Sequence, residues 1–253
     1  MRTADDLRAL VVDAIEGLEL APELGTLAAP VRYAVGGKLI RPVLCLASSE
    51  ALGVEVEDAL PAALAVELVH SFSLVHDDLP ALDDDEVRRG KPTVHAEFGE
   101  RAAILAGDAL LAEAFRLVGS YERPEIVREL ASATLRMIGG QQLDFEGGAE
   151  REQVDQLKTA ALFEAPIACA LVLASVPEAD QRAWRALARE LGLLFQVVDD
   201  ILDGDGFVDE LGEDGARARA DEHAARAQAL LGEVEADTSV LAAIVDALAT
   251  RTV

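Results

Sequence analysis

Five aspartates lie within nine residues of this chain and could bind divalent metal ions. Residues 77–85 read DDLPALDDD, and residues 86–92 continue as EVRRGKP. Carboxylates are ligands that Mg²⁺ prefers, and guanidinium groups fork onto phosphate oxygens. Residue types and spacing therefore predict a site that holds a metal ion and a polyanion together.

A second acidic cluster comprises Asp199, Asp200 and Asp203 and follows the apolar residues 193–195. Gln196, Asp199 and Asp203 are spaced i, i+3 and i+7, so they fall on the polar side of an amphipathic helix. One acidic cluster alone is typical of a solvated helix face. Two such clusters, each preceded by apolar sequence, indicate that they face each other across one cavity and hold a diphosphate through several Mg²⁺ ions.

The first cluster comes at the end of a helix that we expect over residues 57–78. This helix places His70 and Asp77 on one face near its C-terminal end. Pro80 lacks an N–H and biases the residue before it away from helical geometry, so the helix cannot continue regularly. We expect the chain to bulge there and bring Asp83 back towards Asp77.

Lysine is rare in this chain and occurs only at Lys38, Lys91 and Lys158. All three lie in candidate sites, in GGKLIRP at 36–42, in RRGKP at 88–92 and before Thr159. A compact ammonium charge suits contact with phosphate. We therefore interpret all three lysines as phosphate-binding candidates.

Helical periodicity runs through nearly the whole chain, because alanine, leucine and glutamate dominate and aromatic residues make up only 4%. With 51% apolar residues, we expect one all-α domain over residues 1–253. Glycine and proline mark the breaks between helices. The expected helices cover 4–17, 26–35, 39–52, 57–78, 97–119, 124–146, 151–174, 178–203, 207–233 and 236–249.

Composition excludes several classes of partner. A formal net charge of −25 argues against nucleic acid and anionic membrane surfaces, which need a basic footprint. Cys45 and Cys169 lie in apolar runs, so we expect reduced core residues and no zinc site. The N-terminal residues do not resemble a signal peptide, and a cytoplasmic location is expected. The apolar stretch 160–176 is interrupted by Glu164 and Pro166 and is shorter than the ~20 residues of a membrane helix, so we predict a buried helix.

The chain resembles the all-α trans-isoprenyl diphosphate synthases, the polyprenyl synthetase family that includes farnesyl and geranylgeranyl diphosphate synthases. The resemblance spans residues 30–203. It rests on GGKxxRP at 36–42, HDDLPALDDDEVRRGKPTVH at 76–95, LAGDALL around Asp108, GGQQLD at 139–144, Lys158-Thr159 and FQVVDDILD at 195–203.

This resemblance implies an isoprenoid synthase-type helical bundle around a central substrate cavity, working as a cytoplasmic homodimer. It implies a prenyltransferase that condenses isopentenyl diphosphate with an allylic diphosphate to a linear C15 or C20 prenyl diphosphate. Metal and cationic side chains would stabilise the leaving diphosphate, and no protein nucleophile is needed.

The resemblance also implies roles for individual residues. About three Mg²⁺ ions would be bound by Asp77, Asp83, Asp199 and Asp203. The allylic diphosphate would be contacted by Arg88, Lys158 and Gln196. Isopentenyl diphosphate would be held by Gly37, Lys38, Arg41, His70 and Arg89. Thr159 and nearby backbone oxygens would face the carbocation, which gives the catalytic set Asp77, Asp83, Lys158, Thr159, Gln196 and Asp199.

Phe72 and Ser73, one turn before Asp77, would form the floor of the cavity that holds the growing prenyl tail and would set product length. For Phe72 an ordinary core role stays open.

The sequence departs from the family after the second aspartate cluster. A loop of the form GKxxGxDxxxxKxTY, whose lysines close over the substrate, is missing, and no lysine follows Lys158. Arg217 and Arg219 are candidate substitutes. Leu39 also stands where the family commonly has arginine, which we expect to matter less.

Two other functions are compatible with parts of the sequence. The missing loop leaves open a non-catalytic or partner-dependent subunit of a heteromeric prenyl diphosphate synthase. Terpene cyclases share the expected fold and a first aspartate cluster, but their second metal motif is spaced differently and they lack the elements around Lys38 and Arg41. We therefore favour the synthase over the cyclase.

Overall fold

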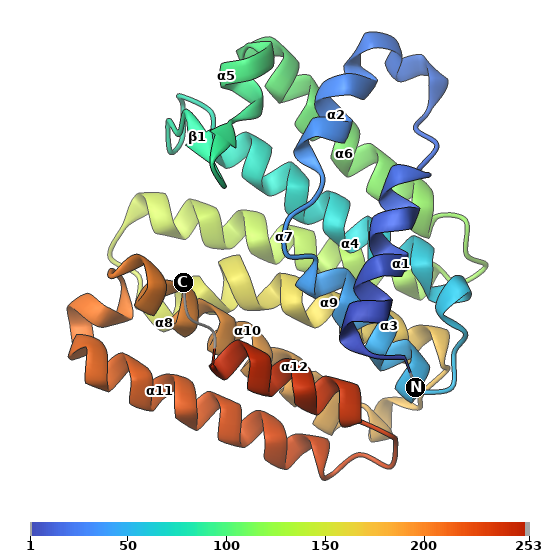
Figure 1. Cartoon of the computed structure of the whole chain (residues 1–253), viewed down its shortest axis with the longest axis vertical. Coiled ribbons are helices and arrows are strands. Elements are labelled where there is room, and N and C mark those ends of the chain that lie inside the picture. The colour runs from blue at the N-terminus through green and yellow to red at the C-terminus, as the bar shows by residue number, and fades with distance from the viewer. Residues whose placement is uncertain (1, 251–253) are drawn as a thin grey trace.

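The computed structural model describes residues 2–250 and is helical almost throughout, as predicted (Figure 1). The α-helices are α1 (Ala4–Glu16), α2 (Ala28–Ala34), α3 (Ile40–Ala51), α4 (Val56–Asp77), α5 (Val94–Phe98), α6 (Glu100–Val118), α7 (Pro124–Glu146), α8 (Arg151–Asp155), α9 (Ala161–Leu173), α10 (Arg182–Asp203), α11 (Phe207–Leu231) and α12 (Ser239–Ala249). The shorter elements are two 3-10 helices, η1 (Pro22–Leu27) and η3 (Glu178–Asp180), a π-helical turn, η2 (Gln156–Ala160), and a hairpin of β1 (Val87–Arg88) with β2 (Lys91–Pro92).

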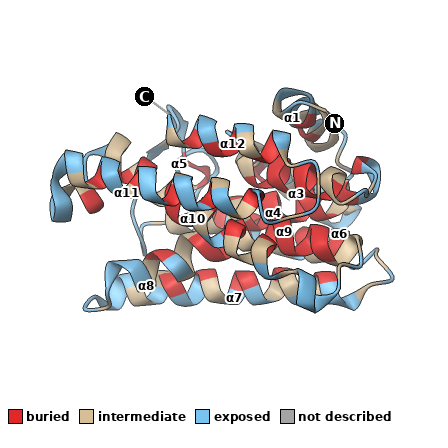
Figure 2. Cartoon of the chain, turned by 90° about the horizontal axis from the view of Figure 1, so that it is seen from below, coloured by how far each residue is buried: buried red, intermediate tan, exposed pale blue. Residues whose placement is uncertain are grey.

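Helices α4 and α9 form the centre of the bundle. Helix α4 packs against α3 and α6, and α9 packs against α3, α7 and α10. Both are apolar around their whole circumference, which is typical of helices enclosed by others. Figure 2 shows buried residues concentrated on these central helices, whereas α8 and α11 expose much of their surface.

Two segments, Val56–Asp77 and Arg151–Leu173, are long and apolar enough to cross a membrane by length and composition alone. Most of each segment is buried inside the bundle, where the core helices of globular proteins also lie. The prediction of a buried helix over 160–176 is confirmed by α9. Cys45 and Cys169 are both buried and unbonded, as expected.

Several helix boundaries differ from the sequence-based prediction. The expected helix 97–119 begins earlier and is split at Gly99 into α5 and α6, because the backbone there has φ 84° and ψ 154°. The expected helix 151–174 is divided into α8, η2 and α9, and helix 207–233 ends at Leu231 and bends at Gly212 (φ 72°). The hairpin at 87–92 was not predicted, since two-residue strands carry no periodic signal.

The π-helical turn η2 lies between α7 and α10 and contacts both. Turns of this kind widen a helix locally and occur often at functional sites. Gly140 of α7 fits closely against it, because a Cβ at this position would overlap the backbone of Leu157 and Lys158. The adjacent Gly139 is exposed and has open space around it.

We expect Gly140→Ala to destabilise the protein by about 1–3 kcal/mol, because the added methyl group must displace the backbone of η2. Gly139→Ala is the matched control and should stabilise the protein by roughly 0.5–1 kcal/mol through helix propensity. Chemical denaturation of both variants measures the two changes. Equal stabilisation by both substitutions would show that η2 is not packed against Gly140.

Candidate active site

The first aspartate cluster begins where α4 ends, and the chain folds back there as predicted. After the C-terminal residue Asp77, the backbone turns at Pro80, and the Asp83 N–H donates to the Asp77 carbonyl at 2.9 Å. Asp77 is half-buried and Asp83 is exposed. Burial, opposed by Lys158 and Arg88 and reinforced by repulsion from Asp83, raises the pKa of Asp77 to about 6.

Arg88 is held by two other carboxylates of the first cluster. Its Nε lies 2.5 Å from the buried Asp78 and its Nη2 lies 3.0 Å from Asp85. These bonds fix the guanidinium beside α4, and Arg88 also lines a cavity that reaches Asp199 and Asp203 of the second aspartate cluster. Asp78 therefore acts as a support for Arg88, a role that the sequence did not distinguish from that of Asp77.

The hairpin of β1 and β2 positions Arg89 and Lys91 differently. Arg89, at the turn (φ 53°), donates from Nη1 to the Gly36 carbonyl at 2.6 Å and lines the same cavity as Arg88. Lys91 instead donates to the Tyr33 carbonyl at 2.9 Å and lies over the Tyr33 ring. The interpretation of Lys91 as a phosphate-binding residue is therefore corrected: it attaches the hairpin to α2.

The second aspartate cluster lies at the C-terminal end of α10. Burial and the neighbouring Asp203 together raise the pKa of Asp199 to about 6, and Arg41 opposes the shift. Asp200 lines the same cavity as Asp199 and Asp203 but is only 4% exposed. It accepts hydrogen bonds from Gln196 Nε2 at 2.7 Å and from the Phe207 backbone N–H at 2.9 Å.

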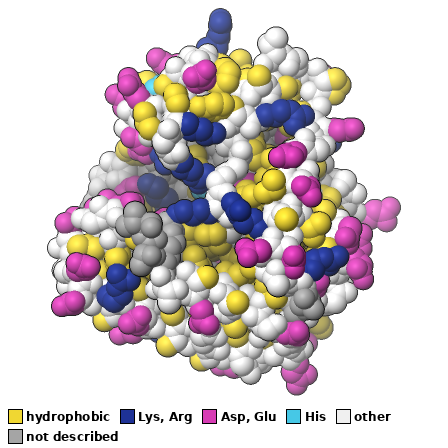
Figure 3. All heavy atoms as spheres, in the orientation of Figure 1, with side chains coloured by type: hydrophobic (Ala, Val, Ile, Leu, Met, Phe, Trp, Pro, Cys, Tyr) yellow, Lys and Arg dark blue, Asp and Glu magenta, His cyan; other side chains and the backbone are white. Residues whose placement is uncertain are grey.

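A cavity of about 270 Å³ connects α4, the start of α3, the hairpin and α10. It brings together most residues that the sequence assigned to phosphate and metal binding. They are Lys38, Arg41, His70, Arg88, Arg89, Asp199 and Asp203. Figure 3 shows Lys and Arg side chains gathered around a hollow on one face of the molecule. We call this space the cationic cavity.

Burial shapes the charges in the cationic cavity. Arg41 is 8% exposed, and desolvation lowers its pKa to about 10. Its Nε has no hydrogen-bond partner, and its guanidinium lies over the Phe163 ring. Burial and nearby arginines, Arg41 first, hold the pKa of His70 well below its usual value, so the imidazole is neutral. Sequence reasoning missed Glu67, whose pKa burial raises to about 7 opposite Arg41.

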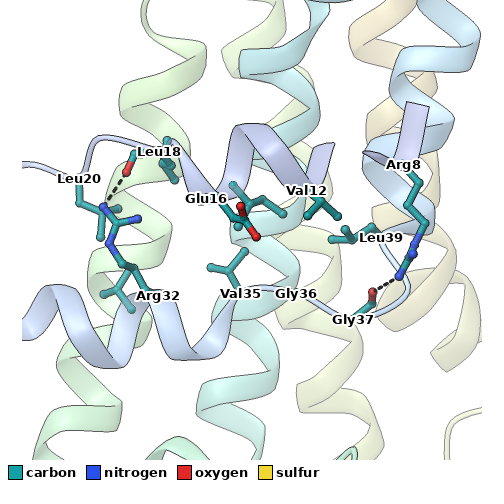
Figure 4. A pocket seen from close by; sticks show the side chains of 12 residues that line it. Arg8, Val12, Glu16, Leu18, Leu20, Arg32, Val35, Gly36, Gly37 and Leu39 are labelled. Carbon is teal, nitrogen blue, oxygen red and sulfur yellow. Dashed lines mark hydrogen bonds between the residues drawn. The ribbon is translucent and has the colours of Figure 1, made fainter. Parts of the chain in front are cut away.

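The loop that carries Gly37 and Lys38 is held by an arginine that the sequence did not single out. Arg8 of α1 donates to the Gly37 carbonyl at 3.2 Å and to the Lys38 carbonyl at 3.4 Å. Figure 4 shows Arg8 reaching this loop beside a separate cavity between α1 and α2. Gly37 lines that neighbouring cavity and not the cationic one, so it supports Lys38 through the backbone.

A second, strongly polar cavity of about 590 Å³ lies between α7, α8, α10 and the start of α11. Lys158 lines it and pairs with Asp144 at 2.6 Å. Asp155 is 5% exposed, and burial and repulsion by Asp200 raise its pKa to about 7. Gln196, Asp199 and Asp203 complete this polar cavity together with Arg151, which bonds Glu210.

A third cavity, of about 370 Å³, is mostly apolar, and Asp77 is among the residues that line it. We call it the tail cavity. Phe72 and Ser73 line it, as the chain-length assignment requires, and the Phe72 ring lies edge-on to His76 with the ring centres 5.0 Å apart. Gln141 also lines it, and neither atom of its amide has a hydrogen-bond partner. The sequence had marked Gln141 only as part of a motif.

The three cavities share lining residues in pairs, and the polar and tail cavities meet at η2. Lys158 lines both the polar and the tail cavity, and Thr159 lines the tail cavity. Arg41 and His70 line both the tail cavity and the cationic cavity. A ligand with an anionic head and an apolar tail would therefore place the bond between them beside η2.

The segment after Asp203 is a turn of three residues, Gly204 to Gly206, that leads directly into α11. Arg217 and Arg219, the candidate substitutes for the missing lysines, are not among the residues lining the three cavities. The arginine that does line the polar cavity beside this turn comes from α8: Arg151 Nη1 lies 3.6 Å from Asp200. The proposed substitution by Arg217 or Arg219 therefore has no support in the geometry.

The donor set fits Mg²⁺ in the presence of a phosphate ligand. Within residues 2–250, no three His, Cys, Asp or Glu side chains converge closely enough to hold a metal ion by themselves. Mg²⁺ in proteins is commonly bound by one or two carboxylates together with substrate phosphates and water. Asp77 with Asp83 on one side, and Asp199 with Asp203 on the other, match that arrangement.

Comparisons with known proteins agree with this geometry. The polyprenyl synthetase family model matches residues 25–229. The farnesyl diphosphate synthase of Bacillus subtilis is 37% identical over 251 residues, covering 85% of this chain and 85% of that protein. The geranylgeranyl diphosphate synthase of Cyanophora paradoxa is 42% identical over 191 residues, covering 68% of this chain and 64% of that protein.

Solved structures share the whole fold. An apo FPP/GFPP synthase from Zymomonas mobilis has a TM-score of 0.86 and 33% identity, covering 97% of this chain and 95% of that one. A geranyltranstransferase from Thermotoga maritima has a TM-score of 0.82 and 31% identity, covering 97% and 96%. The chain belongs to the polyprenyl synthetase family and is a prenyltransferase of the trans-isoprenyl diphosphate synthase type.

Proposed function

We propose that the chain condenses isopentenyl diphosphate with an allylic diphosphate and releases a linear C15 or C20 prenyl diphosphate. The observation that carries this proposal is that a carboxylate-lined polar cavity and an apolar tail cavity meet at Lys158 of η2, while a cationic cavity adjoins the tail cavity at Arg41 and His70. Similarity to enzymes named farnesyl and geranylgeranyl diphosphate synthases supports the short product range.

The allylic substrate would lie with its tail along α4 and its diphosphate between the two aspartate clusters. Asp77 and Asp199 have raised pKa values of about 6 because burial and neighbouring carboxylates disfavour their charge. Bound Mg²⁺ would neutralise the departing diphosphate and relieve this repulsion. Lys158 and Arg88 would add positive charge at the same diphosphate, where preorganised charge is worth most.

The second substrate would occupy the cationic cavity. Lys38, Arg41 and Arg89 line it and would contact the diphosphate of isopentenyl diphosphate. Arg41 is buried with an unpaired N–H, which a phosphate oxygen would satisfy. Neutral His70 can still donate one hydrogen bond there without adding charge next to these arginines.

The reaction itself would need no protein nucleophile. Breaking the allylic C–O bond leaves a cation at C1 and a diphosphate anion, and the alkene of isopentenyl diphosphate then forms a C–C bond to C1. The released diphosphate, kept beside the new bond by Lys158 and Arg88, would take the proton whose loss restores a double bond. The helical walls exclude water, which would otherwise capture the cation.

We expect Asp77→Asn to lower kcat/KM by about 10²- to 10³-fold, which is the loss seen when one preorganised charge contact is removed. Folding stability should not fall, because the substitution removes a buried repulsive charge. Asp221→Asn, on the exposed side of α11, is the matched control. Product analysis with Mg²⁺ and C5, C10 and C15 allylic primers measures activity, and denaturation measures stability.

Absence of product from the wild-type chain with every primer would contradict the proposal. If activity then appeared on adding a second synthase subunit, the missing lysine loop would mark a partner-dependent subunit. Turnover by the purified chain alone would exclude that alternative.

Product length should depend on the aromatic ring at the base of the tail cavity. Phe72→Ala removes that ring, so we expect the product distribution to shift by at least one C5 unit towards longer chains. Phe98→Ala removes a ring that stacks on Tyr33 outside the tail cavity and should leave the distribution unchanged. Chromatography of the dephosphorylated alcohols separates the two cases. An unchanged distribution in Phe72→Ala would make Phe72 an ordinary core residue.

We also propose that the active form is a homodimer formed through α6 and α7. Both helices expose large apolar side chains, Ile104 and Leu105 on α6 and Leu135, Ile138 and Phe145 on α7. The two groups lie near one another, because His76 contacts the Ile104 carbonyl and lines the tail cavity with Ile138 and Phe145. Contiguous exposed apolar surface of this kind commonly marks a protein interface.

We expect the wild-type chain to have twice the monomer mass of 26.8 kDa in sedimentation, and Leu135→Glu to shift it towards monomer. Leu135 is 70% exposed in the isolated chain, so the charge would be buried only in a dimer. Leu211→Glu on α11 is the control, because Leu211 is an exposed leucine outside α6 and α7. A dimer that survives Leu135→Glu would place the interface elsewhere.

A further inference from the structure

Thr159 is connected to the start of α11 by an unbroken line of hydrogen bonds. Its hydroxyl donates to Gln196 Oε1 at 2.7 Å, and Gln196 Nε2 donates to Asp200 Oδ1 at 2.7 Å. Asp200 Oδ2 accepts the backbone N–H of Phe207 at 2.9 Å. The line therefore crosses from η2 through α10 to the turn that replaces a longer loop.

The Phe207 end of this line determines which group donates in each of its hydrogen bonds. The Phe207 backbone N–H can only donate, and an ionised carboxylate can only accept, so Asp200 must receive hydrogen bonds on both oxygens. Gln196 consequently presents its amide N–H₂ to Asp200 and its carbonyl oxygen to Thr159. Thr159 must then donate, and its hydrogen points away from the tail cavity.

We propose that Asp200 is a positioning residue that, through Gln196, keeps the lone pairs of the Thr159 hydroxyl facing the allylic carbocation. The inference rests on the proposed reaction, in which positive charge develops where the tail and polar cavities meet. Thr159 lines the tail cavity at that point, and Gln196 lines the polar cavity. An oxygen dipole fixed in advance towards developing positive charge stabilises the transition state more than the ground state.

Two neighbours hold Asp200 in this role. Arg151 of α8 reaches it at 3.6 Å and is itself bonded to Glu210 of α11 at 3.1 Å. Gly206 lies directly against it, because a Cβ at Gly206 would overlap both the Asp200 carboxylate and the Arg151 guanidinium. The short turn before α11 thus places a backbone donor and a guanidinium on the same carboxylate oxygen.

Asp200→Asn should reverse the line of hydrogen bonds at nearly constant shape. The asparagine oxygen stays opposite the Phe207 N–H, so its amide N–H₂ faces Gln196. Gln196 must then rotate its amide, present its oxygen to position 200 and its N–H₂ to Thr159. The Thr159 hydroxyl becomes an acceptor there, and its hydrogen turns into the tail cavity towards the site of positive charge.

The experiment compares the affinity of two ligands in the presence of Mg²⁺ and pyrophosphate, by calorimetry. One ligand is a tertiary ammonium analogue of the allylic cation, and the other is its uncharged carbon isostere. We expect the wild type to prefer the ammonium, and Asp200→Asn to reduce that preference about 10-fold, with affinity for the carbon isostere unchanged. A preference that is absent in the wild type, or unchanged in Asp200→Asn, would overturn the inference.

Turnover supplies a second readout. We expect Asp200→Asn to lower kcat about 10- to 100-fold with little change in KM. In a Thr159→Val background, which lacks the hydroxyl, the same substitution should change kcat less than about 2-fold. An equal loss in both backgrounds would show that Asp200 does not act through Thr159. If the wild type shows no turnover but still binds the ammonium analogue in preference to the carbon isostere, only the proposed condensation is contradicted.

Asp200→Asn also removes a negative charge, so a second variant must disturb the position of Asp200 and keep its charge. Gly206→Ala displaces the carboxylate without removing it and should also lower the ammonium preference. Gly212→Ala is the control, because Gly212 also has a positive φ, of 72°, but has open space around it. Equal preferences in the two alanine variants would contradict the positioning role.

Discussion

Desolvation of carboxylates, reinforced by repulsion within each aspartate cluster, is the constraint on which this active site depends. Asp77 and Asp199 lie at the ends of two long helices, α4 and α10, and burial and neighbouring aspartates raise the pKa of each to about 6. Such an arrangement costs folding free energy, and rigid helices in an apolar bundle are what hold it in place. Bound cations would relieve this cost while the carboxylates stay ionised, so the fold is prepared for a metal-bound diphosphate.

On the opposite wall of the active site, a buried positive charge is also destabilised by desolvation. Arg41 is buried, its pKa is lowered to about 10, and one of its N–H groups is unpaired. Partly desolvated charges of both signs thus face one space, where Arg41 lowers the pKa of Asp199 without returning it to its ordinary value. Natural proteins accept such destabilised groups mainly where function requires them. A diphosphate with its cations would satisfy both walls together, which links substrate binding to the relief of strain.

The sequence was sufficient to predict what local rules determine. The helical class, the end of α4 at Asp77 and the return of Asp83 follow from periodicity and from Pro80. The uses of Lys91 and Asp200 were not predictable, because each depends on residues distant in sequence: Lys91 is bound by Tyr33, and Asp200 by the start of α11. The π-helical turn also escaped prediction, since it follows from packing between α7 and α10 and not from its own residue types.

The most direct test of the central claim is a calorimetric titration of Mg²⁺ into the wild-type protein, with and without an unreactive allylic thiolodiphosphate. If the carboxylates alone cannot complete a metal site, Mg²⁺ should bind weakly to the free protein and at least about 10-fold more tightly when the analogue is present. By linkage the analogue should gain the same factor from Mg²⁺. Equally tight Mg²⁺ binding without the analogue would contradict the claim that the diphosphate completes the site.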